Sequence, residues 1–300
     1  MKLSYEVIIV GGSYAGLSAA MALGRSLREV LIIDSGSACN RQTPHSHNFI
    51  TQDGVAPAEI TALAKEQVLQ YKTVDFVNDL AIASKESDDG FIVTTQSNIK
   101  FSAKKLIFAT GLKDLIPDTK GFQDCWGISI IHCPYCHGYE FRNNKTGIMA
   151  NGDRAFHLAS LVNNLTDQLY ILTTGKSDFT PEQRQKLNKN SISIIESEIS
   201  EVIHHKGYIQ KVVFGNGELM GFDALYAGFP FKQHSGLPAS LGCELTQHGY
   251  IKVDEFQKTT KEGIFACGDN SIMMRSVANS VASGNLAGAM ANAELTKEQF

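Results

Sequence analysis

The sequence predicts an α/β protein with two domains, one inserted in the other, and three observations support this. The chain has 300 residues, and a single hydrophobic core seldom organises more than about 250 to 300. A strand, a glycine turn, a helix and a second strand follow one another at the N-terminus, and the same order begins again near residue 147. The C-terminal tail again contains strand-like runs bounded by glycines, as the first half does. We therefore expect two Rossmann-like, three-layer dinucleotide-binding domains.

The first domain is expected to open with a βαβ unit. The apolar run at 7–10 predicts a strand, the Ala-, Leu- and Met-rich stretch after it predicts a helix to about Leu27, and a second strand at 30–33 ends on Asp34. The other elements of this half are expected, in chain order, as a helix within 56–70 and strands at 91–95 and 105–108.

The second domain is expected to repeat the strand, turn and helix order. Its strands are predicted at 147–149, 169–172, 191–195, 202–205 and 209–214, and its helices at about 155–163 and 181–187. Gly215-Asn216-Gly217 is typical of a hairpin turn after the last of these strands.

The tail reads as a return to the first domain. A strand is expected at 250–253, followed by a glycine-bounded run at 263–269 and a final helix rich in Ala, Ser and Gly. This order predicts a discontinuous first domain of residues 1–113 and 232–300, with residues 114–231 inserted.

Composition excludes several classes of partner. The 27 basic and 31 acidic side chains give a net charge of −4, which offers no reason to expect nucleic acid or an anionic membrane surface. The apolar start at 7–10 is too short for a signal peptide or a membrane span. Six cysteines in 300 residues are too few for a secreted disulfide scaffold, so we expect a cytoplasmic protein.

The first glycine turn, Gly11-Gly12-Ser13-Tyr14-Ala15-Gly16, predicts a nucleotide site. Glycines between a strand and a helix let backbone N–H groups approach a pyrophosphate at the positive end of the helix. Ser13 replaces the second glycine of the GxGxxG pattern, and Asp34 stands about 20 residues on, where a carboxylate receives ribose hydroxyls. The alternative is a turn whose glycines serve packing alone.

The only closely spaced cysteines are Cys133 and Cys136, in Cys133-Pro134-Tyr135-Cys136-His137-Gly138. Two intervening residues allow a short disulfide, and a helix N-terminus with neighbouring imidazoles favours the thiolate. His132 and His137 flank the pair. A zinc site is the competing reading, but a closed structural site needs four ligands and no second close pair exists, so we expect no metal. An inert buried pair is the third possibility.

The order of the glycine turn, Ala109-Thr110-Gly111 and Ile264-Phe265-Ala266-Cys267-Gly268-Asp269 resembles the FAD signature of the pyridine nucleotide-disulfide oxidoreductases. The resemblance spans nearly the whole chain and implies FAD as cofactor and a homodimer as the assembly. It also implies that Arg275 and the start of the last helix meet the flavin. The cofactor-binding residues it implies are Gly11, Ser13, Ala15, Gly16, Asp34, Asn48, Thr110, Gly111, Gly268, Asp269, Arg275, Ser276 and Val277.

Within that family the cysteine motif is similar to that of low-molecular-weight thioredoxin reductases. CPYCHG, and the segment Pro44-His45-Ser46-His47-Asn48, more closely resemble the dithiol oxidases that close disulfides in gliotoxin and holomycin. The resemblance implies that Cys136 faces the flavin and Cys133 exchanges with a small-molecule or protein dithiol. His137 stands where thioredoxin reductases carry an acidic proton shuttle, so it is expected to act as acid and base, with His45 and His47 as further candidates.

The second nucleotide turn, Ala150-Asn151-Gly152-Asp153-Arg154-Ala155, has lost the first glycine of its pattern. Thioredoxin reductases hold the 2′-phosphate of NADPH with an arginine cluster after the next strand, but this chain has Leu172-Thr173-Thr174-Gly175. The NADPH site is therefore expected to be degraded, while NADH stays open. Three functions remain: a dithiol oxidase that passes electrons to FAD and then O2, a thioredoxin-reductase-like enzyme running the other way, and a non-catalytic redox sensor.

Overall fold

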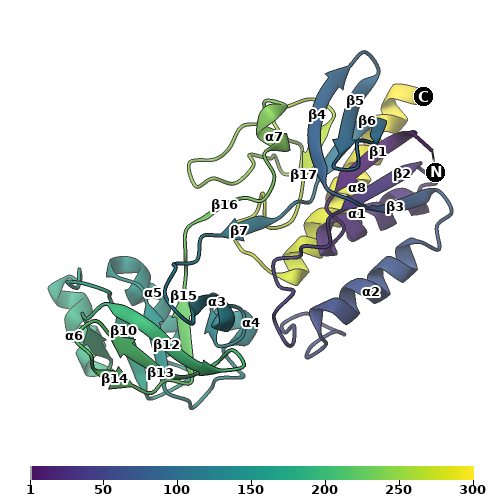
Figure 1. Cartoon of the computed structure of the whole chain (residues 1–300). Coiled ribbons are helices and arrows are strands. Elements are labelled where there is room, and N and C mark those ends of the chain that lie inside the picture. The colour runs from purple at the N-terminus through teal and green to yellow at the C-terminus, as the bar shows by residue number, and fades with distance from the viewer. Residues whose placement is uncertain (1) are drawn as a thin grey trace. The chain divides into compact units, whose positions relative to one another are not determined.

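A computed structural model describes residues 2–300 (Figure 1). The contacts of the chain divide it into two compact units. The first contains Met1–Arg41, Phe49–Lys113 and Phe231–Phe300, and the second contains Gln42–Asn48 and Asp114–Pro230. Each unit has a parallel sheet with helices, which confirms the predicted fold class. The segment Gln42–Asn48 groups with the second unit although its chain neighbours on both sides belong to the first.

The first unit is built on a seven-stranded sheet. The parallel strands are β3 (Val74–Asn78), β2 (Val30–Asp34), β1 (Ser4–Val10), β6 (Lys100–Phe108) and β17 (Ile264–Ala266). Two antiparallel strands, β5 (Gly90–Thr95) and β4 (Ala81–Ser87), extend the sheet from the N-terminal part of β6. The return of the tail to β6 places the Gly268 turn at the same sheet edge as the turns that follow β1 and β6.

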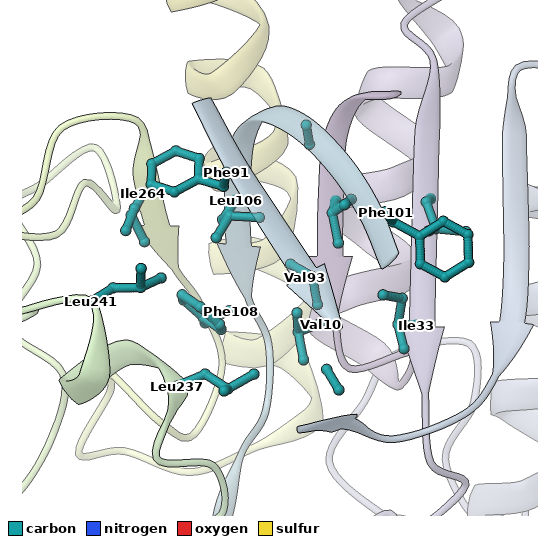
Figure 2. Packing of buried hydrophobic residues seen from close by; sticks show 14 of the residues in the cluster. Val10, Ile33, Phe91, Val93, Phe101, Leu106, Phe108, Leu237, Leu241 and Ile264 are labelled. Atoms are coloured by element: carbon teal, nitrogen blue, oxygen red, sulfur yellow. The ribbon is translucent and has the colours of Figure 1, made fainter. Parts of the chain in front are cut away.

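One face of the five parallel strands packs against side chains of the antiparallel strands β4 and β5 and of the short helix α7 (Leu237–Ser240). Figure 2 shows Leu237 and Leu241 beside Phe108, with Val10 and Ile33 further along the same face. The alternation of side chains along the strands sends Ile8 and Val10 to this face and Val7 and Ile9 to the other.

The other face is covered by three helices: α1 (Tyr14–Arg25), α2 (Pro57–Val68) and α8 (Val277–Gln299). The small residues of α8 allow it to lie directly on α1. A Cβ at Gly284 would collide with the carbonyl of Ala15, and one at Gly288 with the carbonyl of Ala19. Ser18 Oγ donates to Val281 O at 2.7 Å across the same contact. The C-terminal helix therefore fixes the helix that begins at the first glycine turn.

The predicted strand at 250–253 is wrong. Ile251 and Val253 make only isolated bridges, with Leu245 and Thr259. The chain turns at once, because the Asp254 carboxylate accepts hydrogen bonds from the backbone of Phe256 and Lys258. Two short strands that the sequence analysis missed, β7 (Leu112–Asp114) and β16 (Phe231–Gln233), pair where the chain leaves and re-enters the first unit.

The second unit contains a five-stranded parallel sheet in the order β11 (Ser193–Ile195), β10 (Leu169–Leu172), β9 (Thr146–Met149), β15 (Ala224–Ala227) and β8 (Ile130–Ile131). A three-stranded antiparallel sheet consists of β12 (Ile199–His205), β13 (Tyr208–Phe214) and β14 (Leu219–Met220). The helices are α3 (Phe122–Cys125), α4 (Pro134–His137), α5 (Gly152–Val162) and α6 (Pro181–Lys189).

Most predicted elements have their counterparts within a few residues. Helix α5 begins three residues before the predicted start at Ala155, because Asn151 caps it by accepting a hydrogen bond from Gly152 N. Among residues 2–300, no helix combines the length and the apolar character that crossing a bilayer requires.

Candidate active site

Cys133 and Cys136 lie together in the second unit, directly after strand β8. Cys133 is the N-cap residue of α4 and Pro134 occupies the first turn, where a missing N–H costs nothing. The two Sγ atoms are 2.8 Å apart, with Cys136 donating to Cys133. Both thiols are half-buried. The pair is close enough to interconvert between dithiol and disulfide without moving the backbone far.

His137 ends the same short helix and is half-buried as a whole. Both ring nitrogens are buried, and neither has a hydrogen-bond partner among residues 2–300. Burial lowers the pKa of His137, and the nearby His47 adds to the effect, while Glu140 opposes it. The imidazole is therefore held neutral near pH 7, the state in which it can accept a proton from a thiol.

The segment Gln42–Asn48 brings two more histidines to the redox pair. The rings of His47 and His137 meet edge to face with centroids 6.5 Å apart, and His45 lies 6.4 Å from His47. His47 Nε2 is 3.5 Å from the carboxylate of Glu140. His132, the other histidine beside the cysteines, instead lies next to Trp126, with the ring centroids 6.2 Å apart and the rings tilted by 36°. Of the candidate histidines, His47 is thus the one next to His137.

Tyr226 is a member of this site that the sequence analysis missed. It lies on the central strand β15, its side chain is almost wholly buried, and its hydroxyl is 2.8 Å from where a Cβ of Gly138 would stand. Burial raises the pKa of the Tyr226 phenol, and the charges of Cys133 and Glu140 raise it further. No sequence signal separates this tyrosine from the ordinary core residues around it, since its strand is uniformly apolar.

The other cysteines are poor candidates for redox chemistry. Cys125, Cys243 and Cys267 are buried, and burial raises the pKa of each thiol, that of Cys125 to about 11. Cys39 is exposed. Within the described residues, 2–300, no group of three or more His, Cys, Asp or Glu side chains is arranged to hold a metal ion.

The first unit contains a glycine turn that fits a dinucleotide. Gly11 has φ +107°, a backbone conformation that disfavours other residues, and a Cβ there would strike the carbonyl of Ala109. A Cβ at Gly16 would strike the carbonyl of Gly11, so α1 begins as close to β1 as possible. The backbone of Ser13 and Ala15 lies in this turn. Asp34 accepts hydrogen bonds from Gly12 N at 2.9 Å and Gly36 N at 3.1 Å, which fixes its carboxylate beside the turn.

The turns after β6 and β17 adjoin in the same unit. Asn270 donates to Phe108 O at 2.8 Å and to Thr110 Oγ1 at 3.3 Å, and so joins the ATG turn to the Gly268-Asp269 turn. Its own Oδ1 is buried without a partner in the part of the chain that the structure describes. A buried acceptor of this kind is costly unless something donates to it, so the site fits a polar ligand such as FAD. Sequence analysis named Asp269 but missed Asn270.

The remaining predicted FAD residues divide between the units. Arg275 Nε lies 3.4 Å from Asp269 Oδ2, and Ser276 caps α8, whose first residue is Val277, by accepting from Asn279 N at 3.1 Å. Gly111 has open space where a Cβ would point. Asn48, by contrast, belongs to the segment that groups with the second unit, and its φ is +58°.

The second nucleotide turn is occupied by its own side chains. Asn151 Oδ1 accepts from Gly152 N at 2.9 Å and from Asp178 N at 2.8 Å, and Asn151 Nδ2 donates to Lys176 O. The loop after β10 is tied down by Glu196, whose carboxylate accepts from Ser177 N and Ser177 Oγ. These hydrogen bonds lower the pKa of Glu196, and the nearby Arg184 and Lys176 add to the effect, so its carboxylate stays negative beside the loop.

The description "Pyridine nucleotide-disulphide oxidoreductase" belongs to a family model that matches residues 5–284. The chain is 33% identical to "Thioredoxin reductase tcpT" of Claviceps purpurea, over 97% of this chain and 94% of that protein. It is 30% identical to "Thioredoxin reductase aclD" of Aspergillus oryzae, over 94% of each. The crystal structure of an oxidoreductase from Agrobacterium tumefaciens, 35% identical, superposes with a TM-score of 0.91 over 98% of this chain and 99% of that one.

Proposed function

The chain belongs to the pyridine nucleotide-disulphide oxidoreductase family, and from that premise we propose that it oxidises a substrate dithiol to a disulfide. It is a thioredoxin-reductase-like flavoenzyme with FAD as its cofactor. The proposal adds a direction of electron flow and a role for each residue of the redox centre. Cys133 exchanges with the substrate, Cys136 delivers electrons to the flavin, and His137 moves the proton.

The cycle starts with Cys133 and Cys136 joined as a disulfide. A substrate thiolate, deprotonated by neutral His137, attacks Cys133 Sγ, and the bond to Cys136 breaks so that Cys136 leaves as a thiolate. The second substrate thiol passes its proton to His137, which has by then released the first proton to solvent, and attacks the mixed disulfide, which releases the product disulfide and the Cys133 thiolate. FAD, when bound, would supply the sink for the two electrons of the thiol pair, with O2 as the final oxidant and H2O2 as its two-electron product. His137 then gives its proton to solvent.

The observation that supports this direction of electron flow is the second nucleotide turn, whose backbone is already hydrogen-bonded by Asn151. A pyrophosphate at the start of α5 would need the backbone N–H of Gly152, which Asn151 already binds. Residues 172–175 contain no arginine to read a 2′-phosphate, and Arg184, which reaches the same loop, already donates to Ser177 beside the Glu196 carboxylate. A weakened nicotinamide site favours the entry of electrons from the thiol side. This supports the oxidase.

A thioredoxin-reductase-like activity with NADH is the second candidate. The two fungal relatives reported above are named thioredoxin reductases, and Gly152 and Ala155 keep two positions of the nucleotide pattern. In that direction the flavin would reduce Cys133 and Cys136, and the pair would reduce a disulfide. We also propose, from the family resemblance, that the enzyme is a homodimer, and from its cysteine usage that it works in the cytoplasm.

Anaerobic stopped-flow mixing distinguishes the two directions. The purified yellow protein is mixed separately with a dithiol such as dithiothreitol, with NADH and with NADPH, and flavin absorbance is followed. We expect the dithiol to bleach the flavin and both nicotinamides to act at least about 100-fold more slowly. For both nicotinamides the reason is that Asn151 already binds Gly152 N at the pyrophosphate position, and for NADPH the missing arginine fork adds to it. Rapid bleaching by NADH would instead establish the reductase.

A further inference from the structure

The burial of the His137 ring nitrogens limits how a proton taken from a substrate thiol can reach solvent. Neither nitrogen is hydrogen-bonded to any group among residues 2–300. A base that takes the proton of the first substrate thiol must pass that proton on before it can take the proton of the second thiol in the same turnover. In so closed a site the proton has to leave through a neighbouring side chain or an ordered water.

The titratable groups that face His137 come from three parts of the second unit. Cys133 is the N-cap residue of its helix and Cys136 lies within it, the Tyr226 hydroxyl lies beside the next residue, Gly138, and His47 and Glu140 act on its ring. Tyr226 is unsuitable as a proton acceptor, since the raised pKa of its phenol keeps it protonated and neutral at pH 7. The cysteines are the reacting groups themselves.

His47 and Glu140 form a path toward solvent. The His47 ring stands edge to face with His137 at 6.5 Å between centroids, a separation that one water molecule can bridge. His47 Nε2 is 3.5 Å from Glu140 Oε1. The exposed fraction of the side chain is 18% for His47 and 35% for Glu140, so exposure increases along this path.

The segment that carries His47 is held firmly against the redox unit. Thr43 and Ser46 are buried, and Gly127 leaves room for the segment, since a Cβ there would lie 3.0 Å from Thr43 Oγ1 and 3.1 Å from the Gln42 amide nitrogen. A histidine fixed on both sides by packed neighbours has a defined position. This is what a proton carrier requires and what a solvated loop histidine lacks.

We propose that His47, oriented by Glu140, is a second proton station that takes the substrate proton from His137 and releases it to solvent. The proposal rests on the proposed dithiol chemistry and deepens it. The S–H bond of the substrate breaks, the proton passes to His137, then to His47, and then to water beside Glu140. No electrons move in this relay, and each station ends the cycle in the state in which it began.

The test measures thiol chemistry directly, without relying on turnover. The oxidised holoenzyme is mixed with dithiothreitol under anaerobic single-turnover conditions, quenched in acid, and scored for new protein thiols at pH 6 to 9, in H2O and D2O. Wild type is compared with His47→Ala, His47→Gln and Glu140→Gln. His205→Gln and Glu218→Gln are the matched controls, because both residues are exposed and lie on the antiparallel strands of the same unit or the turn between them.

We expect both His47 variants to slow thiol formation by roughly 10- to 100-fold, below the full contribution of a positioned acid-base group. The solvent isotope effect should rise, and free imidazole should restore much of the rate of His47→Ala. Glu140→Gln should show a smaller loss, and the two controls none.

Rates of the His47 variants equal to the controls, or a loss that imidazole does not relieve and that leaves the isotope effect unchanged, would overturn the relay. If wild type itself forms no new thiols, the proposed function fails, and with it the relay. If wild type reacts while the His47 variants match the controls, only the relay fails.

Discussion

The cysteines of this chain differ sharply in their surroundings. Cys133 and Cys136 are half-buried beside a neutral imidazole, whereas three others are enclosed in apolar clusters that raise the pKa of their thiols. The spacing of Cys133 and Cys136 was enough to predict that they lie together, because the two residues are close in sequence. The surroundings of His137 could not be predicted, because His47 lies 90 residues upstream and Tyr226 lies 89 residues downstream.

The difference in burial predicts a labelling pattern. A thiol reagent such as DTNB should react rapidly with Cys39, Cys133 and Cys136 of the reduced native protein and only after unfolding with Cys125, Cys243 and Cys267. Mass spectrometry of the labelled peptides checks it. In the Cys133→Ser, Cys136→Ser double variant only Cys39 should react rapidly. Fast labelling of Cys267 in the native state would contradict the burial described here.

The lowered pKa of His137 predicts an acid limb in the pH profile. The folded-state pKa lies below the ordinary histidine value of about 6.5, so the neutral base persists down to that lower value and is lost as pH falls through it. The rate of dithiol oxidation should therefore decline only below about pH 6.5. His137→Gln should lower the rate by roughly 10²- to 10⁴-fold and abolish the limb. A limb centred above pH 7 would contradict a desolvated imidazole.

The same shift bears on stability. Because unfolding releases His137 to its higher ordinary pKa, the unfolded chain binds a proton more readily, and His137 makes folding less favourable as pH falls below about 6.5. This pH dependence is checked by measuring the free energy of unfolding of wild type and His137→Gln with denaturant at pH 8 and pH 5. The variant should lose less stability than wild type over that interval.

Helices and strands with a clear apolar periodicity could be predicted from the sequence, whereas strands of two or three residues could not. The βαβ order at the N-terminus and α5 to β10 follow from apolar spacing and glycine turns. β7, β8 and β16 are two or three residues long and form only because a distant partner is present. The expected strand at 250–253 had the right composition, but the Asp254 turn follows too closely for a ladder to form.

The contact between α1 and α8 predicts a strong effect of one added methyl group. Gly288→Ala should lower the free energy of unfolding by about 1 to 3 kcal/mol, since the new Cβ meets the backbone of Ala19 and the core cannot yield freely. Gly236→Ala is the control, because its φ is negative and nothing lies within 4 Å of the new Cβ, so its effect should stay within roughly 1 kcal/mol. Equal unfolding curves for the two variants would contradict the close approach of the helices.

At the scale of the whole molecule, the proposed function divides between the two units. The first unit contains the glycine turn, Asp34 and Asn270, which fit the cofactor, and the second contains the thiol pair and the histidines proposed to accept its protons. The glycine turns and the CxxC motif, which predicted this division, are each short continuous segments. The segment Gln42–Asn48 was not predictable, since it leaves the first unit for seven residues to supply His47 to the second.

The central claim is that electrons enter the flavin through Cys133 and Cys136. Anaerobic dithiol titration of the wild-type holoenzyme and of the Cys133→Ser and Cys136→Ser variants, with flavin absorbance and bound FAD both recorded, tests it most directly. We expect two-electron bleaching in wild type and a loss of at least about 10³-fold in rate in each variant, with FAD still bound, because removing a covalent catalyst costs several kcal/mol. Bleaching at the wild-type rate in either variant would contradict the claim.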